Sequence, residues 1–219
     1  MNDFKLSFGI MSLIICFWIP KNASAYSIQR GNVSAILGNY VYRTHYQGSD
    51  PAISTPYLSG PALTVLGDVS DNGSLEIVTI YMNKLYIREQ GGLSVAEKTQ
   101  AFHITMGYRH WFGSYFSTSL GVYTSYPMGE SMIVHDAFPT GQRINTTATE
   151  ASESGLDWSI QWEAWNNGRW GAVLETKYSY SLTKQSNEWA DQYGFNLGVR
   201  YFIQGDDTDA AIQEKRKQK

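Results

Sequence analysis

The sequence has a single cysteine, Cys16, among its 219 residues. Cys16 lies in the N-terminal segment 1–25, which has the organisation of a secretory signal peptide. Removal of this segment leaves a chain without cysteine, which excludes disulfide bonds and thiolate metal sites, although an exported protein could use disulfides. The four histidines lack the spacing of metal ligands, so we expect neither a metal ion nor a cofactor.

Extensive basic patches and long apolar runs are also lacking after segment 1–25. The net charge of the full chain is −3, and loss of Lys5, Lys21 and Asp3 with the signal peptide makes it −4. An acidic chain of this kind is a poor partner for nucleic acid. No apolar run approaches the roughly twenty residues of a membrane helix. These absences argue against a nucleic-acid-binding protein and against a helical membrane protein.

Segment 1–25 predicts export. It has Lys5 in a short polar start, an apolar run over 8–19, and a small-x-small pattern that ends at Ala25. The apolar run is too short to span a bilayer, so a cleaved signal peptide is favoured over an anchor. Cys16 follows an isoleucine, whereas a lipoprotein signal needs a small residue there, so lipidation is not expected.

Apolar and polar residues alternate along most of the remaining chain, which is typical of β-strands because successive side chains point to opposite faces. In 156–165, Trp158 and Trp162 share one face, and Asp157 and Glu163 share the other. Eight segments with this pattern are predicted to be strands: 33–46, 61–70, 75–88, 101–112, 115–126, 156–165, 170–183 and 194–203.

The connections between these segments are predicted to alternate in length. Short ones are expected near 71–74, 112–114 and 166–168, and longer ones near 47–60, 89–97, 127–154 and 184–190. An even number of strands returns both ends of the chain to the side of the short turns. The pattern predicts an all-β fold, an eight-stranded antiparallel up-and-down transmembrane β-barrel with short periplasmic turns and longer external loops. The predicted parts are a signal peptide at 1–25, a barrel at 26–204 and a short polar periplasmic tail at 205–219.

Periodicity alone does not say which face of the barrel points outward. The charged face is rich in Gly and Ser, which suits the crowded interior of a narrow barrel. The apolar face carries aromatic rings near strand ends, as expected for girdles at the two membrane interfaces. The charges predicted to point inward and pair in a plugged interior are Glu76, Lys84, Arg88, Arg109, Asp157, Glu163, Glu175, Lys177 and Arg200. The residues predicted to form the aromatic girdle are Phe112, Phe116, Tyr126, Trp158, Trp162, Trp170, Tyr180, Tyr193 and Tyr201.

The segment 194–203 resembles the terminal strand signal by which outer-membrane barrels are recognised for assembly. The residues that carry this pattern are Asn196, Gly198, Tyr201 and Ile203. With the eight alternating segments, the chain resembles the small outer-membrane barrels of the OmpA-barrel, OmpX and OmpW type, without a signature of any one subfamily. The resemblance implies a Gram-negative outer-membrane location, contact with membrane lipid and folding by the barrel assembly machinery. We expect a monomer.

The sequence leaves three classes of function open. The first is a structural or surface-interaction role, with loop 128–153 as the predicted contact for an extracellular partner. The second is a passage for small apolar molecules, as implied by a resemblance to OmpW. The third is a lipid A-modifying enzyme with a serine, a histidine and a carboxylate. The sequence argues against this third class, because His103 and His110 point to opposite faces and Ile104-Thr105, without a serine, follows His103. No catalytic residue is predicted.

Overall fold

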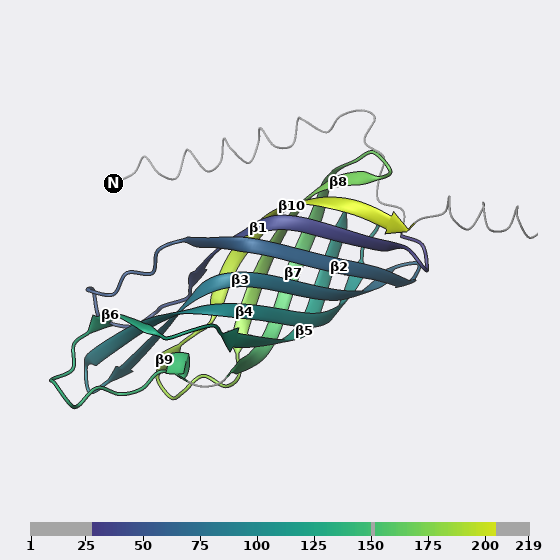
Figure 1. Ribbon diagram of the computed structural model, residues 1–219. Coiled ribbons are helices and arrows are strands. Elements are labelled where there is room, and N and C mark those ends of the chain that lie inside the picture. The colour runs from purple at the N-terminus through teal and green to yellow at the C-terminus, as the bar shows by residue number, and fades with distance from the viewer. Residues whose placement is uncertain (1–27, 150–151, 205–219) are drawn as a thin grey trace, which may run out of the picture.

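The computed structural model describes residues 28–149 and 152–204, and these form one β-barrel (Figure 1). The predicted signal peptide at 1–25 and the tail at 205–219 lie outside the described residues. Among the described residues, no helix has the length and apolar character needed to cross a membrane. The strands are β1 (Val33–Thr44), β2 (Leu58–Ser70), β3 (Gly73–Gln90), β4 (Leu93–Trp111), β5 (Phe116–Pro127), β6 (Met132–Asp136), β7 (Glu153–Asn166), β8 (Trp170–Ser181), β9 (Glu188–Trp189) and β10 (Gln192–Gln204), with one short 3-10 helix, η1 (Thr147–Thr149).

Eight of these strands close into a ring in which every neighbouring pair is antiparallel. The order is β1-β2-β3-β4-β5-β7-β8-β10, and β10 pairs back onto β1 along nearly its whole length. The predicted closed eight-stranded barrel is therefore confirmed. β6 and β9 are short additions that pair with the outer parts of β4 and β3. A closed ring leaves no barrel strand with an unpaired edge, which is the condition for a sheet in lipid.

The two ends of the barrel differ, because tight turns join the strands at one end and long connections join them at the other. Turns at 71–72, 112–115 and 167–169 lie at the end where β1 begins and β10 finishes (Figure 1). The connections 45–57, 128–152 and 182–191 lie at the opposite end, which we call the loop end.

One predicted long connection is wrong. Segment 89–97 contains a tight turn at Gly91-Gly92, and β3 and β4 continue on either side of it. Both glycines have positive φ, +62° and +79°, which suits a two-residue hairpin of the primed type. The prediction failed because strict alternation ceases in this hairpin: Leu85 and Tyr86 are both buried.

The hairpin of β3 and β4 is buried on both faces beyond the barrel wall. On one face, Leu85, Ile87 and Ala96 pack with Tyr46 and Trp189. On the other face, Tyr86 packs with Ala148 and Ala190. A strand covered on both sides loses its apolar-polar alternation, so this part of the sequence does not show a strand pattern.

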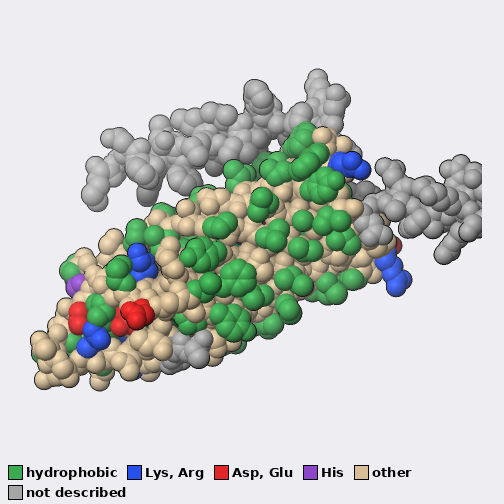
Figure 2. Space-filling model, viewed as in Figure 1, with side chains coloured by type: hydrophobic (Ala, Val, Ile, Leu, Met, Phe, Trp, Pro, Cys, Tyr) green, Lys and Arg blue, Asp and Glu red, His purple; other side chains and the backbone are tan. Residues whose placement is uncertain are grey.

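The outer wall of the barrel is apolar. On β5 the outward side chains from Phe116 to Tyr126 include no charge, and Leu120 and Val122 are each 62% exposed. Ten residue steps at about 3.4 Å, with a tilt of about 40°, give a band about 25 Å tall, the height typical of an outer-membrane barrel. Figure 2 shows hydrophobic side chains spread over the wall and charged side chains gathered toward its two ends.

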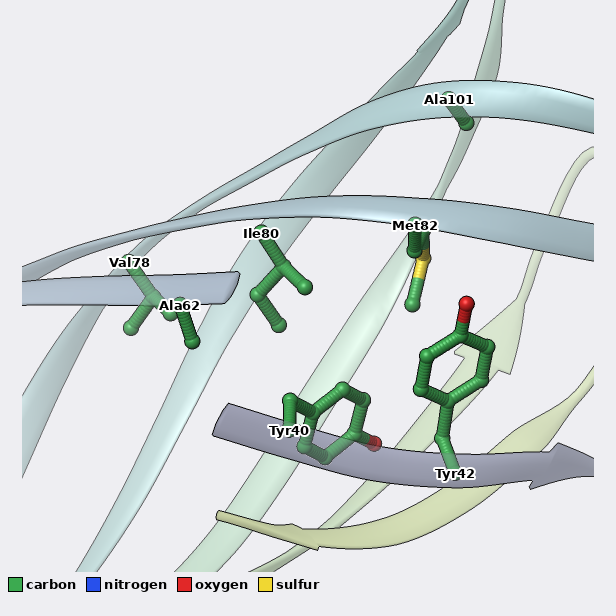
Figure 3. Close-up of a cluster of buried hydrophobic side chains, with 7 residues drawn as sticks. All are labelled: Tyr40, Tyr42, Ala62, Val78, Ile80, Met82 and Ala101. Atoms are coloured by element: carbon green, nitrogen blue, oxygen red, sulfur yellow. The ribbon is translucent and has the colours of Figure 1, made fainter. Parts of the chain in front are cut away.

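Part of the interior is apolar as well. Tyr40 and Tyr42 of β1 stack with ring centroids 5.2 Å apart. They form a buried cluster with Ala62, Val78, Ile80, Met82 and Ala101 from β2, β3 and β4 (Figure 3). This cluster fills the side of the lumen near β1 to β3, so the buried charges described below are concentrated on the side of β4, β7 and β8.

Candidate functional site

Arg109 is the centre of the charge network in the barrel. It is fully buried on β4 and contacts Glu76 of β3 at 2.7 Å and Glu175 of β8 at 2.6 Å. Its guanidinium also donates to the hydroxyls of Ser117 and Ser159 at 3.0 and 3.2 Å. β3 and β8 are four places apart in a ring of eight strands, so Arg109 joins opposite walls of the barrel. The small serines of β5 and β7 leave the space that this guanidinium occupies.

A second group surrounds Asp157 of β7. Its Oδ2 lies 3.2 Å from Nζ of Lys177 and 3.0 Å from Nε2 of His103, and it accepts a hydrogen bond from Thr105. Nδ1 of His103 lies 2.8 Å from the hydroxyl of Ser125. Three donors on one carboxylate oxygen compensate for the loss of water around a buried charge.

A third group lies closer to the loop end. Nζ of Lys84 contacts Glu153 at 2.6 Å, and the hydroxyls of Tyr86 and Tyr123 donate to the same carboxylate. Sequence reasoning missed Glu153, which it assigned to the end of loop 128–153. Extending the alternation of β7 by two steps from Asp157 would have placed Glu153 on the inward face.

The fourth group closes the tight-turn end. Arg200 of β10 pairs with Glu163 of β7 at 2.7 Å, and its guanidinium lies over the ring of Trp111 at 5.2 Å. Nε1 of Trp111 donates to Ser74 Oγ at 2.9 Å, and that hydroxyl donates to Asp68 at 2.6 Å. This chain of contacts crosses the lumen from β10 to β2.

The structure places most of the predicted interior charges together and one of them elsewhere. The buried ones are Glu76, Lys84, Arg109, Asp157, Glu163, Glu175, Lys177 and Arg200. Arg88 instead lies in the hairpin beyond the barrel wall, where its guanidinium donates to the carbonyl of Asn145 at 2.6 Å and to the side chain of Gln185. The prediction for Arg88 extended the barrel face into a region where the alternation no longer holds.

The last part of loop 128–153 covers the loop end of the lumen. Thr146, Thr147 and Ala148 are buried. The hydroxyl of Thr146 donates to Glu97 of β4 at 2.6 Å, and the amide of Thr147 donates to Glu188 of β9 at 2.7 Å. We call residues 145–149 the cap segment. The sequence predicted the whole of loop 128–153 as a contact for a partner, whereas residues 146–148 are buried and most of the exposed residues precede them.

This is the architecture of a small outer-membrane barrel. Three solved structures of such barrels resemble it. OprG from Pseudomonas aeruginosa has 11% sequence identity and a TM-score of 0.48, covering 83% of this chain and 99% of that one. Ail, the attachment invasion locus protein of Yersinia pestis, has 12% identity and a TM-score of 0.44, covering 79% and 100%. Neisserial surface protein A has 11% identity and a TM-score of 0.43, covering 77% and 96%. No protein-family model and no curated protein matches the chain.

The predicted girdle residues lie on the outer wall of this barrel at two levels. Near the tight turns, Phe116 stacks with Trp162 at 6.4 Å, and Trp170 contacts Tyr201 at 4.7 Å. Phe112, 68% exposed, lies beside them in the adjoining turn. Tyr126, Tyr180 and Tyr193 lie near the loop end of their strands. Trp158 pairs with Tyr178, two register positions from Tyr180 toward the tight turns.

The residues of the predicted terminal-strand signal lie on the strand that closes the ring. Gly198 pairs directly with Gly38 of β1, and Asn196 is buried in the lumen. Tyr201 and Ile203 point outward from the last part of β10. A Cβ atom on Gly198 would lie 2.6 Å from the side chain of Ile36, so glycine allows the close approach of the two strands at the seam.

Ser125, His103 and Asp157 contact one another in the order of a nucleophilic triad, which sequence reasoning did not find. It looked for a serine close to His103 in sequence, whereas Ser125 is its partner across β4 and β5. All three side chains are buried below the cap segment, at most 2% exposed, so no substrate reaches the hydroxyl in this structure. Within residues 28–149 and 152–204, no three His, Asp or Glu side chains are grouped to hold a metal ion.

Proposed function

We propose that the protein is a Gram-negative outer-membrane barrel with a structural or surface-interaction role and without a continuous pore. The observation that carries the proposal is Arg109, whose guanidinium joins Glu76 and Glu175 on opposite walls of the lumen. Contacts of the same kind lie above it at Glu153 and below it at Arg200. The cap segment covers the loop end, so a solute would have to displace several buried ion pairs to cross.

The proposed orientation follows from the two ends of the barrel. The tight turns face the periplasm and the loop end faces the exterior, as is usual for outer-membrane barrels. Lipid is the partner of the apolar wall, and the barrel assembly machinery would recognise the strand that carries Asn196, Gly198, Tyr201 and Ile203. The closed ring leaves no barrel edge for a second copy to pair with, which supports a monomer.

The test combines a folding assay with conductance. Protein refolded into outer-membrane lipid should migrate differently in gels before and after heating, and it should remain silent in planar bilayers, where an open porin gives steady steps. Absence of the heat-dependent shift would contradict the membrane barrel. Steady conductance would contradict the closed interior and favour the alternative of a passage for small molecules.

The exposed surface of β6 is the part of loop 128–153 best suited to a partner. β6 pairs with β4 on one side only within the described residues, and Met132, Ile133 and Val134 are between 42% and 52% exposed. Apolar side chains on a strand edge outside the lipid band favour contact with another protein, which can add a strand there.

A paired set of variants tests this contact. Ile133→Lys with Val134→Lys should abolish binding of cells that display the protein to an extracellular protein surface. Ala137→Lys with Thr140→Lys adds the same charge at exposed positions of the same loop and should leave binding unchanged. Equal binding by both variants would exclude β6 as the contact.

A further inference from the structure

A groove lies on the outer wall of the barrel, over β7, β8 and β10. Its volume is about 310 Å³. Trp158 and Ile160 line one side, Tyr193 and Phe195 line the other, and Thr176 lies between them. Tyr57, from the connection before β2, adds to the lining near the loop end. Apart from its floor, the groove is therefore formed by side chains of the wall that the proposed function places in lipid.

The strand register explains why the wall is hollow at this point. Thr176 is directly opposite Phe195 of β10 and Ile160 of β7. A short side chain between two large ones leaves a depression along β8. The floor of the groove is formed by Ser159, Lys177 and Gly194, which belong to the inward-facing positions of their strands. The groove is thus lined mainly by outward-facing side chains, the surface that an acyl chain contacts beside the barrel.

An arginine lies at the loop end of the groove. Cζ of Arg43 lies 5.2 Å from the ring centre of Tyr57 and 6.0 Å from that of Tyr193, and both rings line the groove. Its Nη2 donates to Thr55 Oγ1 at 2.6 Å. In the part of the chain that the structure describes, none of the ion pairs involves Arg43, and no carboxylate neutralises it. This differs from the interior cations Lys84, Lys177 and Arg200, each of which contacts an acid.

A second group with a donor lies near the arginine. His45 follows it by two residues, its ring packs edge-on against Tyr193 at 6.0 Å, and its Nδ1 lies 3.2 Å from the hydroxyl of Tyr178. Tyr178 also lines the groove. The loop end of this apolar groove therefore has a guanidinium, an imidazole and phenol groups at the level where lipid headgroups lie. Arginine is well suited to a phosphate there, since its N–H groups match two phosphate oxygens at once.

We propose that this groove binds one acyl chain of a phosphorylated, multiply acylated lipid of the outer leaflet, with the phosphate held by Arg43. The inference rests on the proposed function, which places the loop end at the outer surface. Charge complementarity favours this occupant over an uncharged molecule, because the guanidinium of Arg43 is partly buried and has no acidic partner among the described residues.

The experiment uses the protein in nanodiscs of phosphatidylcholine, with diphosphorylated lipid A as probe and native mass spectrometry as readout. Arg43→Gln removes the charge and should weaken binding of the probe about tenfold, as expected for loss of a charge-assisted contact. Thr176→Trp fills the groove and should weaken binding to a similar extent without changing any charge. Arg43→Lys, which keeps the charge, should retain more binding than Arg43→Gln.

Two matched controls accompany these variants. Arg169→Gln makes the same change in the exposed turn at the opposite end of the barrel, and Thr79→Trp adds the same ring to the outer face of β3. Both should bind the probe as the unaltered chain does. Lipid A without phosphates should bind weakly to every form and should not distinguish Arg43→Gln from the unaltered chain.

Several results would overturn the proposal. The first is unchanged binding of the probe in both Arg43→Gln and Thr176→Trp. The second is equal binding of the phosphate-free lipid. The third is a dimer that Thr176→Trp abolishes, because a second copy of the chain would then occupy the groove. A heat-dependent gel shift is measured for every variant. Absence of this shift in the unaltered chain would contradict the proposed function itself. A normal shift, with equal binding of the phosphorylated and the phosphate-free lipid, would contradict only the proposed lipid site.

Discussion

Among single residues, Arg109 has four buried polar partners, two carboxylates and two hydroxyls. Removing one member of a buried ion pair leaves the other charge without compensation, which typically costs about 3–5 kcal/mol. Arg109→Ala leaves both Glu76 and Glu175 in that condition. We expect the free energy of unfolding, measured by urea titration in lipid vesicles, to fall by about this amount.

A neutral replacement of the whole group provides the control for this prediction. Glu76→Gln, Arg109→Met and Glu175→Gln together remove all three charges, so no unpaired charge is left. This triple variant should be more stable than Arg109→Ala alone. If the triple variant were the less stable of the two, the cost of an unpaired buried charge would not explain the effect of Arg109→Ala.

Asp50 connects the loop 45–57 to β4 and β6 through a titratable group. The hydroxyl of Ser94 and the amide of Ala52 donate to its carboxylate, and His135 of β6 lies 3.2 Å away, so the pKa of Asp50 is lowered from its usual value. Because the pKa is lowered in the folded state, the ionised Asp50 carboxylate stabilises the docked loop at pH values above the ordinary pKa of an aspartate, about 4. This stabilisation is lost as the pH falls through the lowered pKa.

We therefore expect amide hydrogen exchange in 48–53 to be slow near neutral pH and to accelerate, after correction for intrinsic rates, as pH falls below about 4. Asp50→Asn should exchange faster at neutral pH and lose this dependence. Tyr46, which bonds to Glu89 nearby, does not titrate in this range because burial raises its pKa to about 12. An unchanged pH profile in Asp50→Asn would assign the response to another group.

Individual side chains differ in how far the sequence could place them. Asp157 and Glu175 lie in long alternating strands, so their shared face could be read directly, and the structure has both buried. Arg88 could not be placed, since β3 leaves the barrel wall before it. The contacts of Ser125 with His103 depend on the register between β4 and β5, which alternation within a strand does not specify.

At the scale of elements, the seam between β1 and β10 decides whether the sheet closes. Gly198 pairs with Gly38, and a Cβ on either glycine would lie within 2.6 Å of a side-chain atom across the seam. Gly198→Leu should therefore prevent the strands from pairing, which would abolish the heat-dependent gel shift and increase digestion by added protease.

Gly67 on β2 is the matched control for the seam. An added Cβ there has no neighbour within 4 Å, and its φ is not in the left-handed region. Gly67→Leu should fold and shift as the unaltered chain does. Normal folding of Gly198→Leu, or failure of Gly67→Leu, would show that the seam is not where closure is limited.

The elements that the sequence predicted well are those with one face in lipid and one in the lumen. The eight barrel strands belong to this class, and their order and antiparallel pairing are confirmed. The hairpin of β3 and β4 and the cap segment belong to another class, because contacts from distant loops bury them. Such burial depends on the tertiary fold, so a local pattern does not report it.

At the scale of the whole molecule, the decisive feature is which face of the sheet points outward. Alternation is identical in a soluble barrel and in a membrane barrel, and only the direction of the apolar face separates them. In the structure Trp158 and Ile160 are 52% and 44% exposed, whereas Asp157 and Glu163 are 2% and 1% exposed. Apolar side chains exposed over a whole wall are unfavourable in water and favourable against acyl chains, so the direction of this face is the feature that supports a membrane barrel.

Spin labels along β7 test this claim most directly, because the chain without segment 1–25 has no cysteine to interfere. Single cysteines at 156–163 are labelled in bilayers, and collision rates are measured with oxygen, which concentrates in lipid, and with a water-soluble nickel complex. We predict high oxygen collision at 156, 158, 160 and 162, and low collision with both reagents at 157, 159, 161 and 163. High nickel collision at the odd positions, with protected even positions, would contradict the account.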